Sequence, residues 1–199
     1  MPLREARLGA PPAHGDGGLI ATAVRQEREP FRKGAEMQMG IASLRAPPLR
    51  NVRWMDGDGT EIEKLSLEDL GRGYRILFFY QHACPGCHSH GFPTLARLVE
   101  RLAGPDVSFA AIQTVFEDFD VNRFERIRED QQRYGLRIPF GHAAPLPGDQ
   151  VPRIMTEYRT GGTPWFVGIA PDNQVVFDAF QLDADTLASA LRPLIAFAK

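Results

Sequence analysis

The sequence is poor in cysteine, in long apolar runs and in charge of one sign, and each shortage excludes a class of protein. Two cysteines in 199 residues are too few for the disulfide framework of a small secreted domain. No apolar run approaches the ~18 residues of a membrane span, and the stretch from Ile76 to Tyr80 is typical of the longest. The net charge of −2 gives no overall basic balance to neutralise phosphates. We therefore expect neither a membrane nor a nucleic acid among the partners.

The first 30 residues also lack the features of a targeting peptide. The apolar patch from Leu19 to Val24 is about half the length of a signal-peptide core, and charged residues bracket it. Four acidic residues in this stretch argue against a mitochondrial presequence. We therefore expect a cytoplasmic location, where a cysteine pair is more often catalytic or metal-binding than structural.

Composition divides the chain into an N-terminal extension, residues 1–48, and a domain, residues 49–199. The first 50 residues hold six of the 16 prolines and six of the 19 glycines, which interrupt helices and central strands. The extension is expected to be either flexible or draped over the domain, with a short helix between Leu19 and Glu29.

From residue 49 onward, strand and helix signals alternate, which predicts an α/β domain with a mixed central sheet and helices on both faces. Turn residues from Asp56 to Gly59 predict a first hairpin, and those from Pro171 to Asn173 a terminal one. The expected strands cover 49–55, 60–62, 74–80, 107–115, 136–140, 165–169 and 174–180. The expected helices cover 66–70, 84–102, 124–134, 150–158 and 183–197, with caps at Ser66, at Asp149, and at Asp183 or Asp185.

Both cysteines lie in one segment, Cys84-Pro85-Gly86-Cys87, directly after a buried strand and at the start of a helix. The free N–H groups and the dipole of a helix N-terminus stabilise a thiolate, so this position suits a nucleophilic Cys84. Cys87 would lie one turn inside the helix, close enough to close a small ring with Cys84. Pro85 is compatible with the first helical turn and stiffens the approach of the two sulfurs. A C-x-x-C between a strand and a helix in a cytosolic chain predicts a redox pair.

Three histidines close to this motif leave two alternatives open. His82, His88 or His90 could join both cysteines in a tetrahedral zinc site. All these ligands fall within nine residues, however, whereas zinc sites usually draw a second pair from farther along the chain. His88 and His90 are therefore also candidates for proton transfer to the thiols, with ordinary solvated surface as the alternative.

A second signal lies far along the chain, at Gly162-Thr163-Pro164. A proline that opens a buried strand cannot donate to the strand ladder, and Thr-Pro after a glycine pair is a good place for a cis peptide bond. A cis bond there would leave the Thr163 backbone free to pair with an extended substrate beside Cys84. A trans proline at a strand edge is the alternative.

These two motifs together resemble the thioredoxin superfamily, and residues from about 46 to 198 resemble its TlpA-like redoxin branch. The similarity extends over Leu65–Leu70, Phe78–Gln81, Cys84–Pro93, Gln113–Glu117, Tyr134–Phe140 and Gly162–Pro164. It implies a thioredoxin-like fold in which Cys84 attacks, Cys87 resolves and Pro164 is cis. The helix around Phe124 would be the redoxin-type insertion.

One departure from the thioredoxin pattern concerns proton transfer. The strand Tyr74–Tyr80 contains no carboxylate, so the buried acid that assists the resolving thiol in thioredoxin is missing from its usual place. Glu117, at the end of the neighbouring strand, could substitute for it, or could be a solvated loop acid.

The sequence thus predicts a thiol–disulfide oxidoreductase that needs no cofactor beyond a redox-active Cys84–Cys87 disulfide. Its substrates would be protein or small-molecule disulfides, and its electron donor a thioredoxin-reductase-like protein or a low-molecular-weight thiol. A peroxiredoxin-like thiol peroxidase is a second hypothesis. Leu77 and Gln81 occupy the places where such enzymes need Pro and Thr or Ser. A third is a metal-binding or scaffold protein with a structural C-x-x-C.

Overall fold

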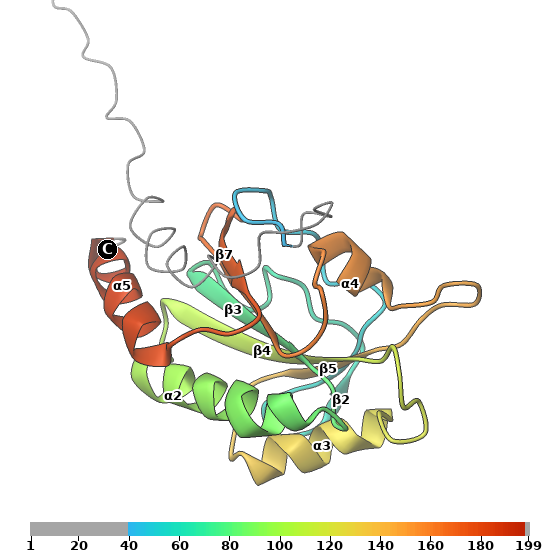
Figure 1. The fold of residues 1–199 in the computed structure, drawn as a ribbon. Helices are drawn as coiled ribbons and strands as arrows, with labels where there is room; N and C mark the ends of the chain where they lie inside the picture. Colours follow the sequence, from blue (N-terminus) through green and yellow to red (C-terminus); the bar gives the residue numbers. More distant parts are fainter. Residues whose placement is uncertain (1–39, 198–199) are drawn as a thin grey trace, which may run out of the picture.

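The computed structural model describes residues 40–197, and their strands form one mixed sheet (Figure 1). Its strand order is β2-β1-β5-β4-β3-β6-β7. Strand β4 runs parallel to both β3 and β5, whereas β6 runs antiparallel to β3 and β7. The strands are β1 (Arg53–Met55), β2 (Glu61–Ile62), β3 (Tyr74–Tyr80), β4 (Val107–Thr114), β5 (Phe140–Ala143), β6 (Trp165–Ile169) and β7 (Val175–Ala179).

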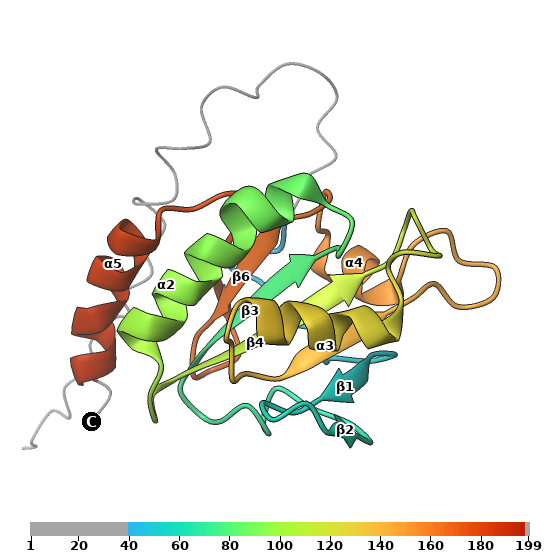
Figure 2. The same cartoon turned by 90° about the horizontal axis from the view of Figure 1, so that it is seen from below.

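Helices cover both faces of the sheet (Figures 1 and 2). One face packs against α2 (Phe92–Leu102), α3 (Phe124–Arg133) and α5 (Ala184–Phe197), and the other against α4 (Arg153–Tyr158). The five-residue π-helical segment η2 (Cys87–Gly91) leads directly into α2. Among residues 40–197, no helix combines the length and apolar character needed to cross a bilayer. This architecture agrees with the expected mixed α/β fold.

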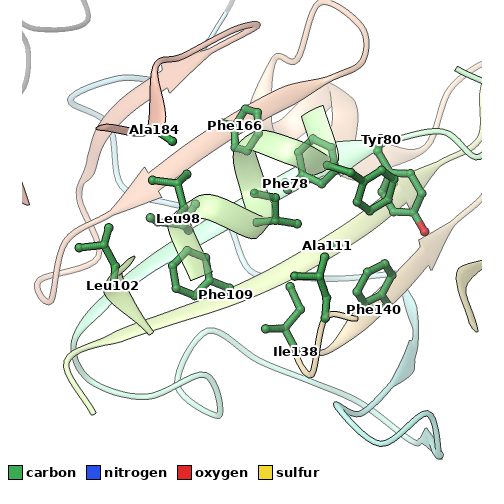
Figure 3. Close-up of a cluster of buried hydrophobic side chains, with 14 of the residues drawn as sticks. Phe78, Tyr80, Leu98, Leu102, Phe109, Ala111, Ile138, Phe140, Phe166 and Ala184 are labelled. Atoms are coloured by element: carbon green, nitrogen blue, oxygen red, sulfur yellow. The ribbon is translucent and has the colours of Figure 1, made fainter. Parts of the chain in front are cut away.

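Strand β3 divides the hydrophobic core into two clusters, as its continuous apolar sequence predicts. Ile76, Phe78 and Tyr80 point into the cluster under α2 and α5, which Figure 3 shows in close-up. Leu77 and Phe79 point into the cluster on the opposite face. Because side chains alternate along a strand, this central strand anchors both layers of the domain.

Residues 40–49 pack against the β7 edge of the sheet. Ile41 and Leu49 are buried in the same cluster as Leu77, and the backbone of Ser43 donates to the carbonyl of Val175 at 2.7 Å. This segment therefore completes one face of the core. The remainder of the predicted extension, with the helix expected between Leu19 and Glu29, lies outside the described residues.

Several predicted boundaries are wrong, and three of the differences are explained by proline or by a left-handed residue. The first strand begins only at Arg53 because Asn51 has a φ of 56°. Strand β5 begins at Phe140, not at Leu136, because Pro139 has no N–H for a strand ladder. The helix predicted from residue 150 begins at Arg153 because Pro152 is extended, with φ −56° and ψ 137°.

Two predicted caps fit the structure differently. The segment after Ser66 is a turn and not a helix, and Ser66 and Asp69 bond each other within it. Asp149 does not cap α4, since its carboxylate bonds the side chain of Arg153. Asp183 does accept from the backbone N–H of Thr186, as expected for the cap of α5.

Candidate active site

The two cysteines lie where β3 ends and the helix containing η2 and α2 begins, the edge of the sheet to which the arrow of β3 points in Figure 2. Residues Gln81 to Cys84 form a short connection, in which the N–H of Cys84 donates to the carbonyl of Gln81 at 3.2 Å. The helix starts at Pro85, which occupies its first turn as expected. The sequence thus delivers Cys84 to the N-terminus of a helix at the carboxyl end of a buried strand.

Cys84 and Cys87 are close together but differ in exposure. They come within 2.8 Å of each other and carry no disulfide bond in this structure. The N–H of Cys87 donates to the Cys84 sulfur at 3.2 Å, which orients that sulfur at the start of the helix. Cys84 is half-buried, whereas Cys87 is completely buried. A reagent at the surface can therefore reach Cys84 first.

The Thr163–Pro164 segment lies against the cysteines, and its peptide bond is cis. The Cys84 sulfur lies 3.7 Å from the carbonyl oxygen of Thr163, to which the thiol can donate. A Cβ at Gly86 would lie 3.6 Å from the Pro164 ring, which is ordinary contact. A Cβ at Gly91 would lie only 2.7 Å from the buried ring of Phe78 and 3.0 Å from Pro164. Glycine at position 91 therefore allows the helix to pack closely on Phe78 and Pro164.

The surface is hollowed beside Cys84. This hollow, which we call the Cys84 hollow, has a volume of about 340 Å³. Thr163 and Pro85 line it near the sulfur, and residues from the loops after β4 and β7 line its outer part. A substrate that enters it meets Cys84, while Cys87 remains behind in the core.

A network of hydrogen bonds connects the histidines near the cysteines to α3 and to the residue that follows it. Nδ1 of His82 lies 3.0 Å from both carboxylate oxygens of Asp130, a side chain that is completely buried. The two nitrogens of His88 lie 2.7 Å from the Tyr134 hydroxyl and 2.6 Å from the carbonyl of His82. Because a carbonyl only accepts, Nε2 of His88 must carry a proton in this arrangement. Both histidines are thus held in fixed orientations.

Burial changes the proton affinities of the groups behind Cys84. Burial raises the pKa of the Cys87 thiol far above that of a free thiol, and the neighbouring Cys84 raises it further. Burial likewise raises the pKa of the Asp130 carboxyl, while His82 opposes this shift. The pKa of Tyr80 is raised by its complete burial and by the negative charges of Asp130 and Cys87. The buried Tyr80 hydroxyl is therefore within the electrostatic influence of both the Asp130 carboxylate and Cys87.

The other predicted site residues take different places. His88 belongs to the network with Asp130, whereas His90 is exposed and its ring bonds the neighbouring Ser89, at 2.7 Å. Glu117 is exposed on the loop after β4, where it lines the Cys84 hollow. The buried carboxylate of this site is Asp130 and not Glu117.

The group with metal-ligand spacing in the described part of the chain does not include the cysteines. Within residues 40–197, the group with metal-ligand geometry is His82, His88 and Asp130, whose ligand atoms all lie within 4.8 Å of one another. Both nitrogens of His88 and Nδ1 of His82 already have protein partners. The arrangement is therefore a hydrogen-bond network in this structure.

Asp130 is the main functional candidate that the sequence analysis missed. It lies in a helix that is mostly charged, yet it follows Phe124 and Ile127 at spacings of three, and all three side chains are buried. A carboxylate on the apolar stripe of an amphipathic helix is the signal that could have identified it.

The π-helical turn between the cysteines and α2 was also not predicted. The N–H of Phe92 donates to the carbonyl of Cys87, five residues earlier, immediately before Pro93. Because Pro93 has no N–H and its ring would crowd the preceding turn of an α-helix, a widened turn accommodates it.

Comparisons with known proteins agree with this fold. No protein-family model matches the chain, and no curated protein matches it in sequence. A thiol-disulfide isomerase from Corynebacterium glutamicum is similar in structure with a TM-score of 0.64 and 29% identity, over 76% of this chain and 97% of that one. A protein described as thioredoxin-like superfamily gives a TM-score of 0.65 and 26% identity, over 76% and 96% of the two chains.

A third similarity concerns the fold alone. A thiol:disulfide interchange protein from Chlorobium tepidum gives a TM-score of 0.56 at 15% identity, over 82% of this chain and 99% of that one. The order of the strands, the position of both cysteines and these structural neighbours lead to one conclusion. The chain belongs to the thioredoxin superfamily.

Proposed function

We propose that the protein is a thiol–disulfide oxidoreductase that reduces protein disulfides, with Cys84 as the nucleophile and Cys87 as the resolving thiol. One observation carries this proposal. The Cys84 sulfur opens onto a hollow beside Thr163, while Cys87 is buried within 2.8 Å of it. Structural neighbours described as thiol-disulfide isomerase and thioredoxin-like support the reaction class.

The reaction conserves atoms and electrons in two exchanges. The Cys84 thiolate attacks one sulfur of the substrate disulfide, forms a mixed disulfide and releases the first substrate thiolate, which takes up a proton. Cys87 then loses its proton and attacks the Cys84 sulfur, which releases the second substrate thiol. Two electrons have passed to the substrate, and the protein is left with a Cys84–Cys87 disulfide. A thiol donor, either a reductase or a low-molecular-weight thiol, restores both thiols by the reverse exchange.

The second exchange needs a proton acceptor, because burial raises the pKa of Cys87 and keeps it protonated at neutral pH. We assign this role to Asp130, with Tyr80 as the group between the carboxylate and the thiol. The charges of both Cys87 and Asp130 act on Tyr80, and Asp130 bonds His82, which is partly exposed. A proton can leave Cys87 through Tyr80 to Asp130 and reach solvent through His82.

The finer assignment to the TlpA-like redoxin branch rests on the motifs quoted above, together with the α3 insertion between β4 and β5. We further propose that Thr163 pairs with the substrate backbone, since its carbonyl lies beside the attacking sulfur. A cytoplasmic location remains part of this proposal.

Turnover of insulin disulfides with a dithiol donor tests the function. The wild-type protein should accelerate the reaction, and Cys84→Ser should abolish the acceleration. The zinc content of the same preparation tests the alternative, a metal-binding or scaffold protein with a structural C-x-x-C. One zinc per chain that is lost with either cysteine, without disulfide turnover, would contradict the proposed function.

A further inference from the structure

The outer wall of the Cys84 hollow is acidic. Glu117 and Asp118 line it, and Asp120 follows them on the same exposed loop. None of these three carboxylates forms an ion pair with another residue of the range 40–197. We call residues Phe116 to Val121 the rim loop. Glu117 and Asp118 therefore place negative charge on the wall of the hollow that also contains Cys84.

The same rim is unusually apolar for an exposed surface. Of the five large hydrophobic side chains that are exposed in residues 40–197, Phe180 lines the hollow, and Phe119 and Val121 belong to the rim loop next to its lining residues Glu117 and Asp118. Phe119 is 55% exposed and Phe180 47%. Exposed apolar side chains that gather in one place mark an interaction surface.

A buried donor in the wall of the hollow lacks a partner. Gln81 is only 1% exposed and lines the hollow, and its Nε2 group has no hydrogen-bond partner among the described residues. Its Oε1 accepts from the Thr163 hydroxyl at 3.4 Å, which leaves the N–H groups for another acceptor. Because Nε2 is itself buried, a peptide carbonyl held beside Thr163 would satisfy this donor once the Gln81 amide turns toward the hollow.

The rim loop is fixed relative to the cysteines. The side chain of Asn122 donates to the carbonyl of Glu117 and accepts from the N–H of Ala83, both at 3.0 Å. Asn122 is buried, and it therefore ties the rim loop to the residue that precedes Cys84. Asp118 has a φ of 48°, and its backbone carbonyl accepts from the N–H groups of Val121 and Asn122, which closes the loop.

We propose that the rim loop selects disulfides in cationic polypeptide segments, in which Lys or Arg and a large apolar residue flank the cysteine. This inference rests on the proposed function and names its substrate class. The carboxylates attract the basic side chain, Phe119 and Phe180 contact the apolar one, and Gln81 bonds the peptide backbone. An anionic small disulfide such as glutathione disulfide is repelled by the same charges and is a poor substrate.

The test measures the rate at which defined disulfides oxidise the pre-reduced protein at low ionic strength. Two peptides, each carrying one cysteine as a mixed disulfide with 2-mercaptoethanol, differ only in Leu-Lys or Leu-Glu flanks. Neutral 2-hydroxyethyl disulfide provides the reference rate for each protein. We expect the Lys peptide to react about tenfold faster than the Glu peptide, and the ratio to fall to about twofold in 0.5 M salt.

Two matched triple variants locate the effect. The rim variant E117Q/D118N/D120N should reduce the preference to about twofold, since rim charges act mainly on association. The control variant E63Q/E68Q/E100Q removes three exposed acids that do not line the hollow, and it should keep the wild-type preference. An unchanged preference in the rim variant, or an equal loss in the control variant, would overturn the inference.

A double-mutant cycle tests the proposed contact between the apolar residue of the peptide and Phe119. Replacement of the peptide's flanking Leu by Ser should slow the reaction with the wild-type protein about threefold. The same replacement should have little effect on the reaction with the Phe119→Ser variant, because the effects of changing two residues in contact are not additive. Equal effects on both proteins would refute the contact. If none of the three disulfides reacts, the proposed function itself fails. If all react but the Lys and Glu peptides react equally, only the rim-loop selectivity fails.

Discussion

At the scale of single residues, Cys84 and Cys87 lie three positions apart yet occupy different environments. Cys84 is half-buried at the hollow, and Cys87 is sealed behind it next to Tyr80 and the Asp130 network. An exposed nucleophile is useful in the first exchange, whereas the buried thiol must lose a proton in the second. The division of labour between the two sulfurs therefore follows from burial and from access to a base.

Asp130→Asn should slow the second exchange by about tenfold or more, because general-base assistance is typically worth 10²–10⁴-fold. The carboxylate accepts a proton only above its folded pKa, which burial raises. The wild-type rate should therefore fall as the pH drops through that pKa, and the pH–rate profile of Asp130→Asn should lack this fall. Glu129→Gln, the exposed neighbour on α3, is the control. Identical pH–rate profiles for Asp130→Asn and Glu129→Gln would remove Asp130 from the mechanism.

The residues of the site could be predicted from the sequence where they belong to a local motif, or to the Gly162–Pro164 motif that the resemblance pairs with it. Cys84, Cys87 and Pro85 belong to one motif that lies between a strand and a helix. Asp130 reaches the site from α3, 48 positions from its partner His82, and no local pattern records that distance. Its position on the apolar stripe of α3 was the one available sign.

At the scale of elements, the helix that starts at Pro85 is held against the sheet by Gly91, whose missing Cβ admits the ring of Phe78. Strands β3, β4 and β6 were predicted almost to the residue because their sequences are continuous and apolar. The π-helical η2 segment and the late start of β5 were not predicted, because each depends on a proline whose effect is set by neighbouring turns or strands.

Gly91→Ala should destabilise the protein by about 1–3 kcal/mol, the usual range for overpacking, since the new methyl group meets a buried ring at 2.7 Å. Gly86→Ala is the matched variant in the same helix, where the nearest atom is 3.6 Å away. It should leave the free energy of unfolding unchanged or raise it by up to about 1 kcal/mol through helix propensity. Chemical denaturation measures both, and equal effects of the two substitutions would contradict the packing described for Gly91.

At the scale of the whole molecule, one sheet separates two hydrophobic clusters, and ionisable groups such as Cys87 and Asp130 are buried among them. The general architecture follows from the sequence because alternating strand and helix signals leave few arrangements. The packing of residues 40–49 against β7 does not follow from it, since this segment is rich in turn residues and joins the core through distant partners.

The burial of Cys87 predicts how stability depends on pH. A thiol whose folded pKa is raised is protonated in both states below about pH 9, so its contribution to stability is fully present there. Above that pH the unfolded chain loses the proton first, and stability should fall by about 1.4 kcal/mol per pH unit from this group. Cys87→Ser should show a shallower loss between pH 9 and 10, and should run parallel to the wild-type protein below pH 8. Parallel curves across the whole range would show that Cys87 is not buried as described.

The most direct test of the central claim, that Cys84 attacks and Cys87 resolves, is to trap the intermediate. Reduced Cys87→Ser protein is mixed with a peptide disulfide, and mass spectrometry with proteolytic mapping locates the adduct. We expect a stable mixed disulfide on Cys84 that accumulates to near one per chain, with none in the wild-type protein, where Cys87 releases it. An adduct that forms on Cys87 in the Cys84→Ser protein, with no adduct on Cys84 in Cys87→Ser, would contradict the account.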